Sequence, residues 1–297
     1  MSGAPRAVVV TRPTELEHVV ARHGTRAQAR FALAARGQSI DDIEGRHAAF
    51  EGVLTRVSQA IPSRWRSARV GRADLPRFVW EPGDIVLAVG QDGLVANVAK
   101  YLTGQLVVGV NPDPSRIDGV LVRHGAERLA EVLARTMERR ATVEERTLVE
   151  AELDDGQRLR ALNEIYLGHR THQSSRYSIG FHDHKERQSS SGIIVATGTG
   201  STGWARSIAQ SRRESVALPA PAEPVLAFFV REAFPSVSTG CSITQGRIGA
   251  DEALEVRSEI EDGGVIFGDG LEDDRLRVGW GMRVQVKVAP ERLHLVV

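Results

Sequence analysis

The first half of the chain alternates short apolar runs with longer segments of helical spacing. Three runs have the β-branched, apolar composition of buried strands: RAVVVTR (6–12), DIVLAVG (84–90) and QLVVGV (105–110). Segments with helical spacing lie between and after them, at 15–36, 43–60, 94–102 and 127–140. Strands that alternate with helices in this way predict a doubly wound parallel sheet up to about residue 140.

After that point the pattern changes to many short β-like runs separated by Gly, Asp and Ser, and only GSTGWARSIAQ (200–210) has helical spacing. Such runs predict an antiparallel, β-sandwich-like domain. We therefore expect an α/β domain over 1–141 and an all-β domain over 142–297, whose last strand is a candidate to return to the first domain. No flexible linker separates the two, and a cleft between two domains is a usual place for a ligand.

Composition excludes several classes of partner. Lysine plus arginine equals aspartate plus glutamate at 38 each, so no overall field draws the chain to nucleic acid or to an anionic membrane. No apolar stretch approaches the roughly 18 residues of a membrane span. The single cysteine, Cys241, excludes an internal disulfide and is expected to be buried or half-buried. MSGAPRAVVV leads almost directly into a strand, so we expect no targeting peptide and a cytoplasmic protein.

The turn GQDG (90–93) follows the second predicted strand, at the edge of the sheet where ligands of parallel sheets gather. Gly90 and Gly93 can adopt backbone angles that other residues avoid, and they let phosphate oxygens reach main-chain N–H groups. Asp92 would repel phosphate, so its place there suits a group that takes a proton from a hydroxyl or helps to hold a metal ion. The alternative is that Asp92 caps the following helix.

Two polar motifs in the second half also suit a ligand site. Asn163 and Glu164 are adjacent in a strand-like context, an unfavourable pair for a core. The segment TGTGSTGWARS (197–207) places hydroxyl groups and glycines before a helix, a composition that suits hydrogen bonds to a base, sugar or phosphate. Its alternative reading is an ordinary turn with a helix cap at Ser201 or Thr202.

Taken in order, GQDGL, the Asn-Glu pair and TGTGSTGW resemble the three motifs of the NAD kinase family. The segments VGVNPDPSRIDGVL, ALNEIYLG, SSGIIVATGTGSTGW and FFVRE are similar to the mitochondrial-type subgroup and its bacterial relatives. The resemblance covers nearly the whole chain. It implies transfer of the γ-phosphate of ATP, or of polyphosphate in some members, to the 2′-hydroxyl of the adenosine ribose of NAD.

The resemblance also implies roles for single residues. Asp92 would be the catalytic base, acting with Mg²⁺ or another divalent cation that no protein side chain is predicted to ligate. The implied substrate-binding residues are Asp92, Gly93, Asn163, Glu164, Thr199, Thr202, Gly203, Trp204 and Ser207. The phosphate-binding candidates are Gly90, Gln91, Asn111 and Arg116. Trp204 would stack on a base, with ordinary packing as its alternative, and Arg116 has a solvated surface arginine as its alternative. NAD and ATP are the implied partners, in a homodimer or higher homo-oligomer.

The first motif departs from the family at two positions. Gln91 replaces a glycine, and if that position has positive φ the change costs about 1 kcal/mol or more. Leu94 replaces a threonine and loses a hydroxyl. Replacing Gln91 by Gly is therefore expected to improve use of the phosphoryl donor. A dinucleotide-binding or regulatory protein with impaired catalysis is one alternative function, and a related lipid or sugar phosphotransferase is another. The choices between ATP and polyphosphate, and between NAD and NADH, stay open.

Two further motifs have structural readings. Asp269-Gly270 resembles an Asp-Gly turn of the family and predicts a tight hairpin turn. His182, Asp183 and His184 have the composition of metal ligands, but in an extended segment Asp183 points away from the two histidines. A charged, exposed loop is expected there.

Overall fold

The computed structural model describes residues 4–297 and divides the chain into two compact units. Unit 1 contains the chain up to Tyr101, Gln105–Val143 and Leu295–Val297. Unit 2 contains Leu102–Gly104 and Glu144–His294. No helix within the described residues is long and apolar enough to cross a membrane.

Unit 1 is built on a parallel sheet with the strand order β2-β1-β3-β4-β5. Its strands are β1 (Arg6–Thr11), β2 (Arg66–Gly71), β3 (Asp84–Val89), β4 (Leu106–Asn111) and the short β5 (His124–Gly125). Every residue of β3 is buried, as expected for a central strand covered on both faces. The guanidinium of Arg6 forms two hydrogen bonds with the buried carboxylate of Asp84, at 2.8 and 2.7 Å, and so joins the first residues of β1 and β3.

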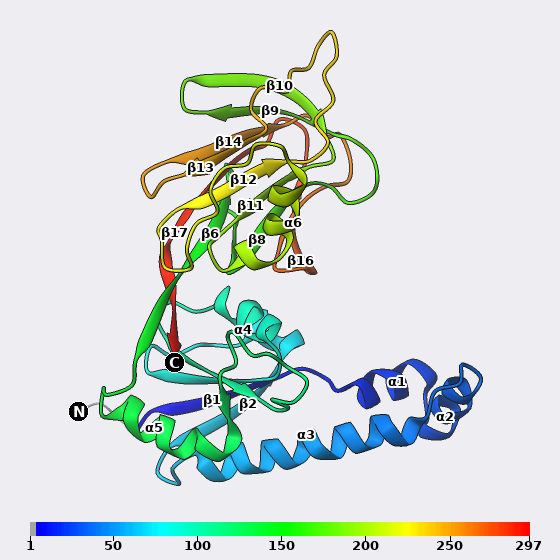
Figure 1. Cartoon of the computed structure of the whole chain (residues 1–297), viewed down its shortest axis with the longest axis vertical. Helices are drawn as coiled ribbons and strands as arrows, with labels where there is room; N and C mark the ends of the chain where they lie inside the picture. The colour runs from blue at the N-terminus through cyan, green and yellow to red at the C-terminus, as the bar shows by residue number, and fades with distance from the viewer. Residues whose placement is uncertain (1–3) are drawn as a thin grey trace. The chain divides into compact units, whose positions relative to one another are not determined.

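Helices cover both faces of this sheet. One face packs against α3 (Ile40–Ala60) and α5 (Leu129–Met137), which share a core with alternate residues of β1, β3 and β4. Helix α4 (Asp92–Ala99), buried from Leu94 onward, contacts the same three strands and the short 3₁₀ helix η1 (Arg72–Arg77), and Figure 1 draws it on the other side of the sheet. A second 3₁₀ turn, η2 (Ala126–Arg128), leads into α5.

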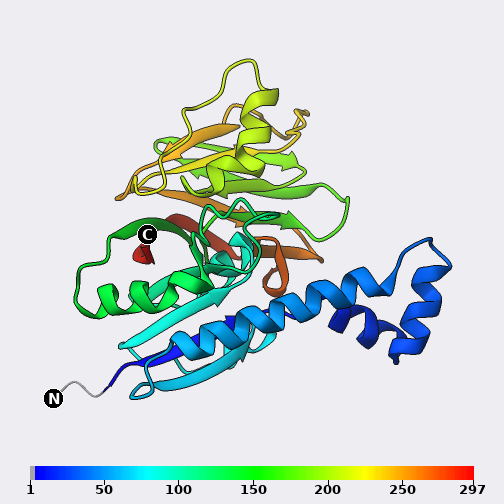
Figure 2. The same cartoon turned by 60° about the horizontal axis from the view of Figure 1, so that its bottom comes forward.

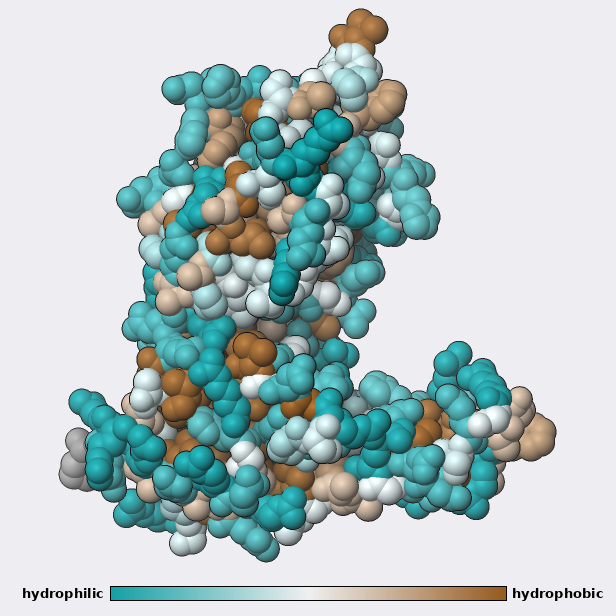
Figure 3. All heavy atoms as spheres, viewed as in Figure 1, coloured by the Kyte–Doolittle hydropathy of each residue, from teal (hydrophilic) through white to brown (hydrophobic). Residues whose placement is uncertain are grey.

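The segment 15–36, expected as one helix, is two. Helix α1 (Glu15–His23) ends at Gly24, whose φ of +83° is left-handed, and α2 (Arg26–Ala34) begins at the cap residue Thr25. With the N-terminal end of α3 they form a helical arm within unit 1 (Figure 2), which has a small core of its own: Leu16, Ala29, Leu33, Ile40 and Ile43. The arm is mostly hydrophilic on the face seen in Figure 3, with apolar side chains at its far end; Phe31 of α2 is 79% exposed.

Unit 2 is formed by two antiparallel sheets. A six-stranded sheet has the order β13-β12-β11-β8-β15-β16, and the strands β10, β9, β14 and β17 pair in that order in the other sheet, where β6 pairs with β17 and β7. The bounds are β6 (Val143–Leu153), β7 (Arg158–Ala161), β8 (Glu164–His169), β9 (Ser175–Phe181), β10 (His184–Ser190), β11 (Ile193–Ala196), β12 (Leu226–Val230), β13 (Gln245–Ile248), β14 (Ala253–Ser258), β15 (Gly264–Gly268), β16 (Leu271–Val278) and β17 (Arg283–Val296).

The main core of unit 2 lies between these sheets and includes Tyr177, Ile179 and Phe228. Helix α6 (Trp204–Ser211), preceded by the 3₁₀ turn η3 (Gly200–Thr202), packs its Ala205 against Ala196, Ala227 and Phe229 of the six-stranded sheet. An α/β unit together with an all-β unit confirms the predicted fold class. The end of β17 belongs to unit 1, where the N–H of Val297 donates to Thr142 O at 3.0 Å.

Other local expectations are wrong. Strand β2 was not predicted, because RSARVG is polar and lies at the edge of the sheet, paired only with β1. Cys241 is exposed rather than buried. Asp269 and Gly270, by contrast, form the predicted turn of the β15–β16 hairpin, with φ of +55° and +66°. His182 and His184 flank the β9–β10 turn, and no group of three or more metal-ligating side chains is found within residues 4–297.

Glycines of unit 1 give a matched test of this packing. A Cβ on Gly109 of β4 would lie 2.7 Å from Val122 Cα and closer still to the Leu121 carbonyl, so Gly109→Ala should lower the free energy of unfolding by about 2 kcal/mol. Gly52 of α3 is exposed with open space around it, so Gly52→Ala should raise stability by about 0.5–1 kcal/mol. Urea unfolding of both variants measures the change in the free energy of unfolding, which should be negative for Gly109→Ala and positive for Gly52→Ala. An unchanged free energy in Gly109→Ala would contradict the close approach of the 121–122 backbone to Gly109.

Candidate functional site

In unit 1 the GQDG turn lies where β3 ends and α4 begins, at the carboxyl edge of the sheet. The N–H of Gly90 donates to Val110 O at 3.1 Å, which fixes the turn to the end of β4. Neither Gly90 nor Gly93 has positive φ, so neither uses the backbone angles that only glycine adopts readily. Gly93 is exposed with open space where a Cβ would be, so this glycine leaves the backbone accessible.

Asp92 is the first residue of α4, but it does not cap that helix. Its carboxylate accepts three backbone hydrogen bonds from a loop about 30 residues further along the chain. The donors are the N–H groups of Val120 (3.0 Å, to Oδ2), Leu121 (2.8 Å, to Oδ1) and Val122 (3.1 Å, to Oδ1). An ionised carboxylate has about four acceptor directions, so one direction on Oδ2 is left for a further donor.

The four phosphate candidates of unit 1 differ in whether they line a cavity. Asn111 is buried and holds its own loop, since its Nδ2 donates to Ile117 O at 2.9 Å and its Oδ1 accepts from Asp113 N at 3.0 Å. Arg116 is exposed on that loop. Gly90 and Gln91 line a cavity of about 190 Å³, whereas Asn111 and Arg116 do not.

In unit 2 a second aspartate organises the Asn-Glu pair. The carboxylate of Asp269 accepts from Leu162 N at 3.0 Å and from Asn163 N at 2.7 Å, and the Asp269 N–H donates to Glu164 O at 3.1 Å. The β15–β16 hairpin turn is thereby tied to the residues between β7 and β8. The sequence identified Asp269 as a turn residue but gave no sign of these contacts, because its partners lie more than 100 residues away.

The segment 197–203 packs against the same turn. Thr197 donates its N–H to Asn163 O at 2.9 Å and its hydroxyl to Leu162 O at 2.5 Å. A Cβ on Gly200 would lie 2.6 Å from Asn163 C, so glycine is needed for this close approach. The contact brings the predicted residues Asn163, Glu164, Thr199, Thr202, Gly203 and Trp204 into one region of unit 2.

The residues of this region differ in whether their side chains are accessible to a ligand. The Thr199 hydroxyl is buried and lies 3.5 Å from an Arg146 nitrogen, and the Thr202 hydroxyl donates to Thr199 O at 3.2 Å. Thr202, Gly203 and Ser207 are exposed. These three positions are therefore accessible to a ligand, whereas the Thr199 side chain is not.

Glu164 is the group in this region whose charge is most perturbed. Its side chain is half-buried and has no hydrogen bond or ion pair with the described part of the chain. Burial, and then the negative charge of Asp269, raises the pKa of Glu164 to about 7. A carboxyl group that is partly desolvated and unpaired is typical of a binding or catalytic position.

Trp204 lies beside a cavity of about 590 Å³, within the 300–1,000 Å³ that ligand sites usually have. Its ring is 37% exposed, is nearly parallel to that of Tyr166 with centroids 6.2 Å apart, and has the Arg231 guanidinium 5.3 Å from its centroid. Phe267 and Val265 add apolar surface to the same cavity. The lining is largely aromatic, and its three arginines, Arg170, Arg231 and Arg275, outnumber its one carboxylate, Glu272, which suits an anion that carries a ring.

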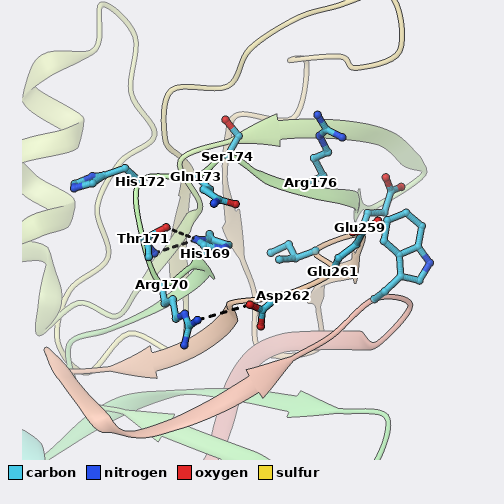
Figure 4. Close-up of a pocket in the computed structure, with 12 residues that line it drawn as sticks. His169, Arg170, Thr171, His172, Gln173, Ser174, Arg176, Glu259, Glu261 and Asp262 are labelled. Atoms are coloured by element: carbon cyan, nitrogen blue, oxygen red, sulfur yellow. Dashed lines mark hydrogen bonds and ion pairs between the residues drawn. The ribbon is translucent and has the colours of Figure 1, made fainter.

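A neighbouring cavity of about 870 Å³ shares the residues 169–172 with it. Figure 4 shows that its Arg170 and Asp262 point toward one another, with a closest N–O distance of 3.7 Å. His169 is held by Thr171, whose N–H donates to Nδ1 at 3.0 Å, and His172 extends away from the group. Charges of both signs line this cavity, so it shows no preference for one kind of ion.

Solved structures are known that combine a parallel α/β unit with an antiparallel β unit and match nearly the whole chain. A structure of yeast NADH kinase complexed with NADH matches 100% of this chain and 84% of that chain, with a TM-score of 0.62 and 14% sequence identity. An NAD kinase from Archaeoglobus fulgidus in complex with ATP matches 98% of this chain and 93% of that one, with a TM-score of 0.58 and 18% identity.

No protein-family model matches the sequence, and the comparison with curated proteins finds no match. From the two structural matches, the chain has the fold of NAD and NADH kinases. At sequence identities of 14% and 18%, this likeness establishes the fold alone. The roles of the site residues depend on the geometry described above.

The raised pKa of Glu164 gives a pH dependence with a definite sign. The folded state keeps a proton that the unfolded state releases above its ordinary value of 4.5, so stability falls as the pH rises from about 4.5 to about 7. Glu164→Gln should remove this loss, so the free energy of unfolding that it gains over the wild type should be larger at pH 8 than at pH 4 by about 3 kcal/mol, since the pKa rises from 4.5 to about 7 and one pKa unit corresponds to about 1.4 kcal/mol.

Urea unfolding of both proteins across pH 4–8 measures this difference. Glu261→Gln, at an exposed position of the same unit, is the control; it retains Glu164 and should keep the wild-type loss of stability with rising pH. A parallel pH profile for the wild type and Glu164→Gln would contradict the unpaired, desolvated carboxyl group.

Proposed function

We propose that the protein is an NAD kinase, which transfers the γ-phosphoryl group of ATP to the 2′-hydroxyl of the adenosine ribose of NAD and produces NADP. The observation that carries the proposal is the unpaired Glu164, held beside Asn163 by Asp269 and the segment 197–203, in a chain with the fold of NAD and NADH kinases. A vicinal pair of ribose hydroxyls is a chemical match for such a carboxylate, because each hydroxyl is a donor and a carboxylate is a strong acceptor.

Unit 2 is the proposed binding unit for the dinucleotide. Asn163 and Glu164 would bind ribose hydroxyls and the edge of a base, while the exposed Thr202, Gly203 and Ser207 would contact the nucleotide from the α6 side. Trp204 would place its ring against a base at the 590 Å³ cavity. The alternative for Trp204, ordinary packing, accounts for its contact with Tyr166 but not for its exposed fraction of 37%.

Phosphoryl transfer requires a new bond between the 2′-oxygen and the γ-phosphorus as the bond from that phosphorus to the bridging oxygen of ADP breaks. The hydroxyl proton leaves with this change, and ADP and NADP are the products. Because the transition state is loose, catalysis depends mainly on positioning and charge neutralisation. The free direction on Asp92 Oδ2 is suited to accept and orient the attacking hydroxyl, and Asp92 is our proposed catalytic residue.

Mg²⁺ would neutralise the donor phosphates. The described residues offer no preformed cluster of three or more metal ligands, and three hydrogen bonds occupy most of the Asp92 carboxylate. Mg²⁺ commonly binds through substrate phosphates and waters with few protein ligands. A cation that enters with ATP is compatible with this chain, but the side chains do not define its position.

The occupied carboxylate of Asp92 also favours a second candidate, a dinucleotide-binding protein without phosphoryl transfer. Leu94, which replaces a hydroxyl residue of the family motif, is 2% exposed and serves the core of unit 1. Purified protein with NAD or NADH, ATP and Mg²⁺, scored for NADP(H) by a coupled dehydrogenase, separates the candidates. Turnover supports the kinase, whereas NAD binding without product from ATP or polyphosphate supports the second candidate.

For an active enzyme, Asp92→Asn should lower kcat by at least about a hundredfold, with NAD affinity retained, because it removes the acceptor that orients the hydroxyl. Asp118→Asn, at an exposed position of the 111–122 loop, is the matched control and should keep near-normal kcat. Circular dichroism and the unfolding temperature check that both variants fold. A near-normal kcat in Asp92→Asn would remove this residue from the mechanism.

A further inference from the structure

A cavity of about 260 Å³ lies on the outer face of one sheet of unit 2. Its lining comes from β10, β9, β14 and β17, four strands that pair in this order. Along β14 and β17, the lining residues Arg257 and Arg283 directly follow and precede Val256 and Val284, whose side chains belong to the core between the two sheets. Because successive side chains of a strand point to opposite faces, the two arginines lie on the face turned away from that core.

This cavity and helix α6 lie on different sides of unit 2. Helix α6 packs on Ala196 and Phe229 of the six-stranded sheet, whereas their neighbours Val195 and Phe228 belong to the core between the sheets. The cavity and α6 are therefore on the outer faces of two different sheets, with the core between them. The cavity shares no residue with the region of Asn163 and the segment 197–203.

The hollow exists because β9 carries small residues at this level of the sheet. Gly180 is the cross-strand partner of Lys185 on one side and of Glu255 on the other. Ser178 is the partner of Arg257 in the same way. Since Gly180 has no side chain and Ser178 a short one, the longer side chains of the neighbouring strands surround an open space.

The charges around the hollow are unbalanced. Three cations line it, Lys185, Arg257 and Arg283, against the single carboxylate of Glu255. The side chains of all four are exposed and have no hydrogen bond or ion pair with any other residue of the chain between positions 4 and 297. Arg257 and Arg283 are also direct cross-strand partners, an arrangement of like charges that destabilises a sheet.

Other cations on the same face do have carboxylate partners. Lys287, two strand positions after Gln285 on β17, donates from Nζ to Glu152 Oε2 at 2.7 Å. Arg187 of β10 donates from Nε to Glu259 Oε2 at 2.6 Å. The lack of partners is therefore specific to the cations around the hollow. A concave surface with an excess of one charge attracts ligands of the opposite charge.

The chemistry of the lining restricts this ligand further. A guanidinium fork matches the oxygens of a phosphate group, and the adjacent Arg257 and Arg283 offer two such forks. An ionised carboxylate can only accept hydrogen bonds, so Glu255 repels phosphate but suits a hydroxyl group, as does the amide of Gln285. The volume of about 260 Å³ is slightly below the usual range of drug-sized ligands, which favours a small molecule.

From this arrangement we infer that the cavity is a second ligand site, which binds a small phosphate ester that carries hydroxyl groups, as a sugar phosphate does. Arg257 and Arg283 bind the phosphate, and Lys185 adds its charge from the opposite side of the hollow. Glu255 and Gln285 bind the hydroxyl groups. The inference does not depend on the proposed kinase function, because the site uses none of the residues of that function.

Ribose 5-phosphate is the probe, measured by calorimetry with the whole chain in the absence of NAD and ATP. Arg257→Gln should weaken its binding at least about tenfold, because a charge-assisted contact is lost. Arg277→Gln removes the same charge from an exposed position of β16 outside the cavity and is the matched control. Equal affinities of these two variants, or no binding by the wild type at millimolar concentrations, would overturn the inference.

The fold of Arg257→Gln is checked by circular dichroism and by its unfolding temperature. This temperature should be unchanged or higher than that of the wild type, because the substitution removes the repulsion between Arg257 and Arg283.

Glu255→Gln distinguishes a hydroxylated phosphate ester from inorganic phosphate. It should weaken the binding of ribose 5-phosphate, because a charged acceptor for the hydroxyl groups is lost. The same variant should strengthen the binding of inorganic phosphate, because a negative charge is removed from the cavity. Stronger binding of both ligands would overturn the assignment of a hydroxylated ester.

Discussion

Three backbone N–H groups that converge on the Asp92 carboxylate determine the shape of the unit 1 site. They fix the loop residues Val120, Leu121 and Val122 against the start of α4, and Gly109 allows that loop to lie directly on β4. Hydrogen bonds to a charged acceptor contribute about 1.5–3 kcal/mol each, so the turn and the loop behave as one rigid element. The fourth acceptor direction of the Asp92 carboxylate, on Oδ2, is left over and is suited to orient a ligand hydroxyl.

In unit 2 another aspartate carboxylate, that of Asp269, also accepts hydrogen bonds from backbone N–H groups. Its donors are the N–H groups of Leu162 and Asn163, and the carboxylate beside it, Glu164, has no hydrogen-bond or ion-pair partner within residues 4–297. One acid thus holds the backbone while its neighbour is available to a ligand. After burial, the negative charge of Asp269 is the second cause of the raised pKa of Glu164, so the residue that holds the backbone also influences the protonation of its neighbour.

The sequence predicted those features that depend on local pattern. The buried strand β3 and the Asp269-Gly270 turn follow from apolar composition and turn chemistry, and the fold class followed from the order of such elements. Strand β2 was missed because an edge strand needs no apolar face, and the break of the first predicted helix at Gly24 depends on one left-handed residue.

The hydrogen bonds of the site residues could not be predicted from the sequence, for a different reason. Asp92 and Asp269 accept hydrogen bonds from backbone groups, which carry no signal in the amino-acid code, and their donors are 28 to 107 residues away. Asn111 is a phosphate candidate of the sequence, and only the folded chain shows that its side chain also holds its own loop. Arg12 lies in a segment without any motif, and only the folded chain shows that it meets Gln91.

The helical arm gives the two walls of the 190 Å³ cavity of unit 1 unequal stability. One wall belongs to the fully buried strands of the sheet, while the other, with Arg46 and His47, depends on a small cluster of apolar side chains around Leu16 and Ile43. Segments with few buried contacts open locally at lower free energy than a central sheet. Amide hydrogens of α1 and α2 would then exchange with solvent well before those of β3.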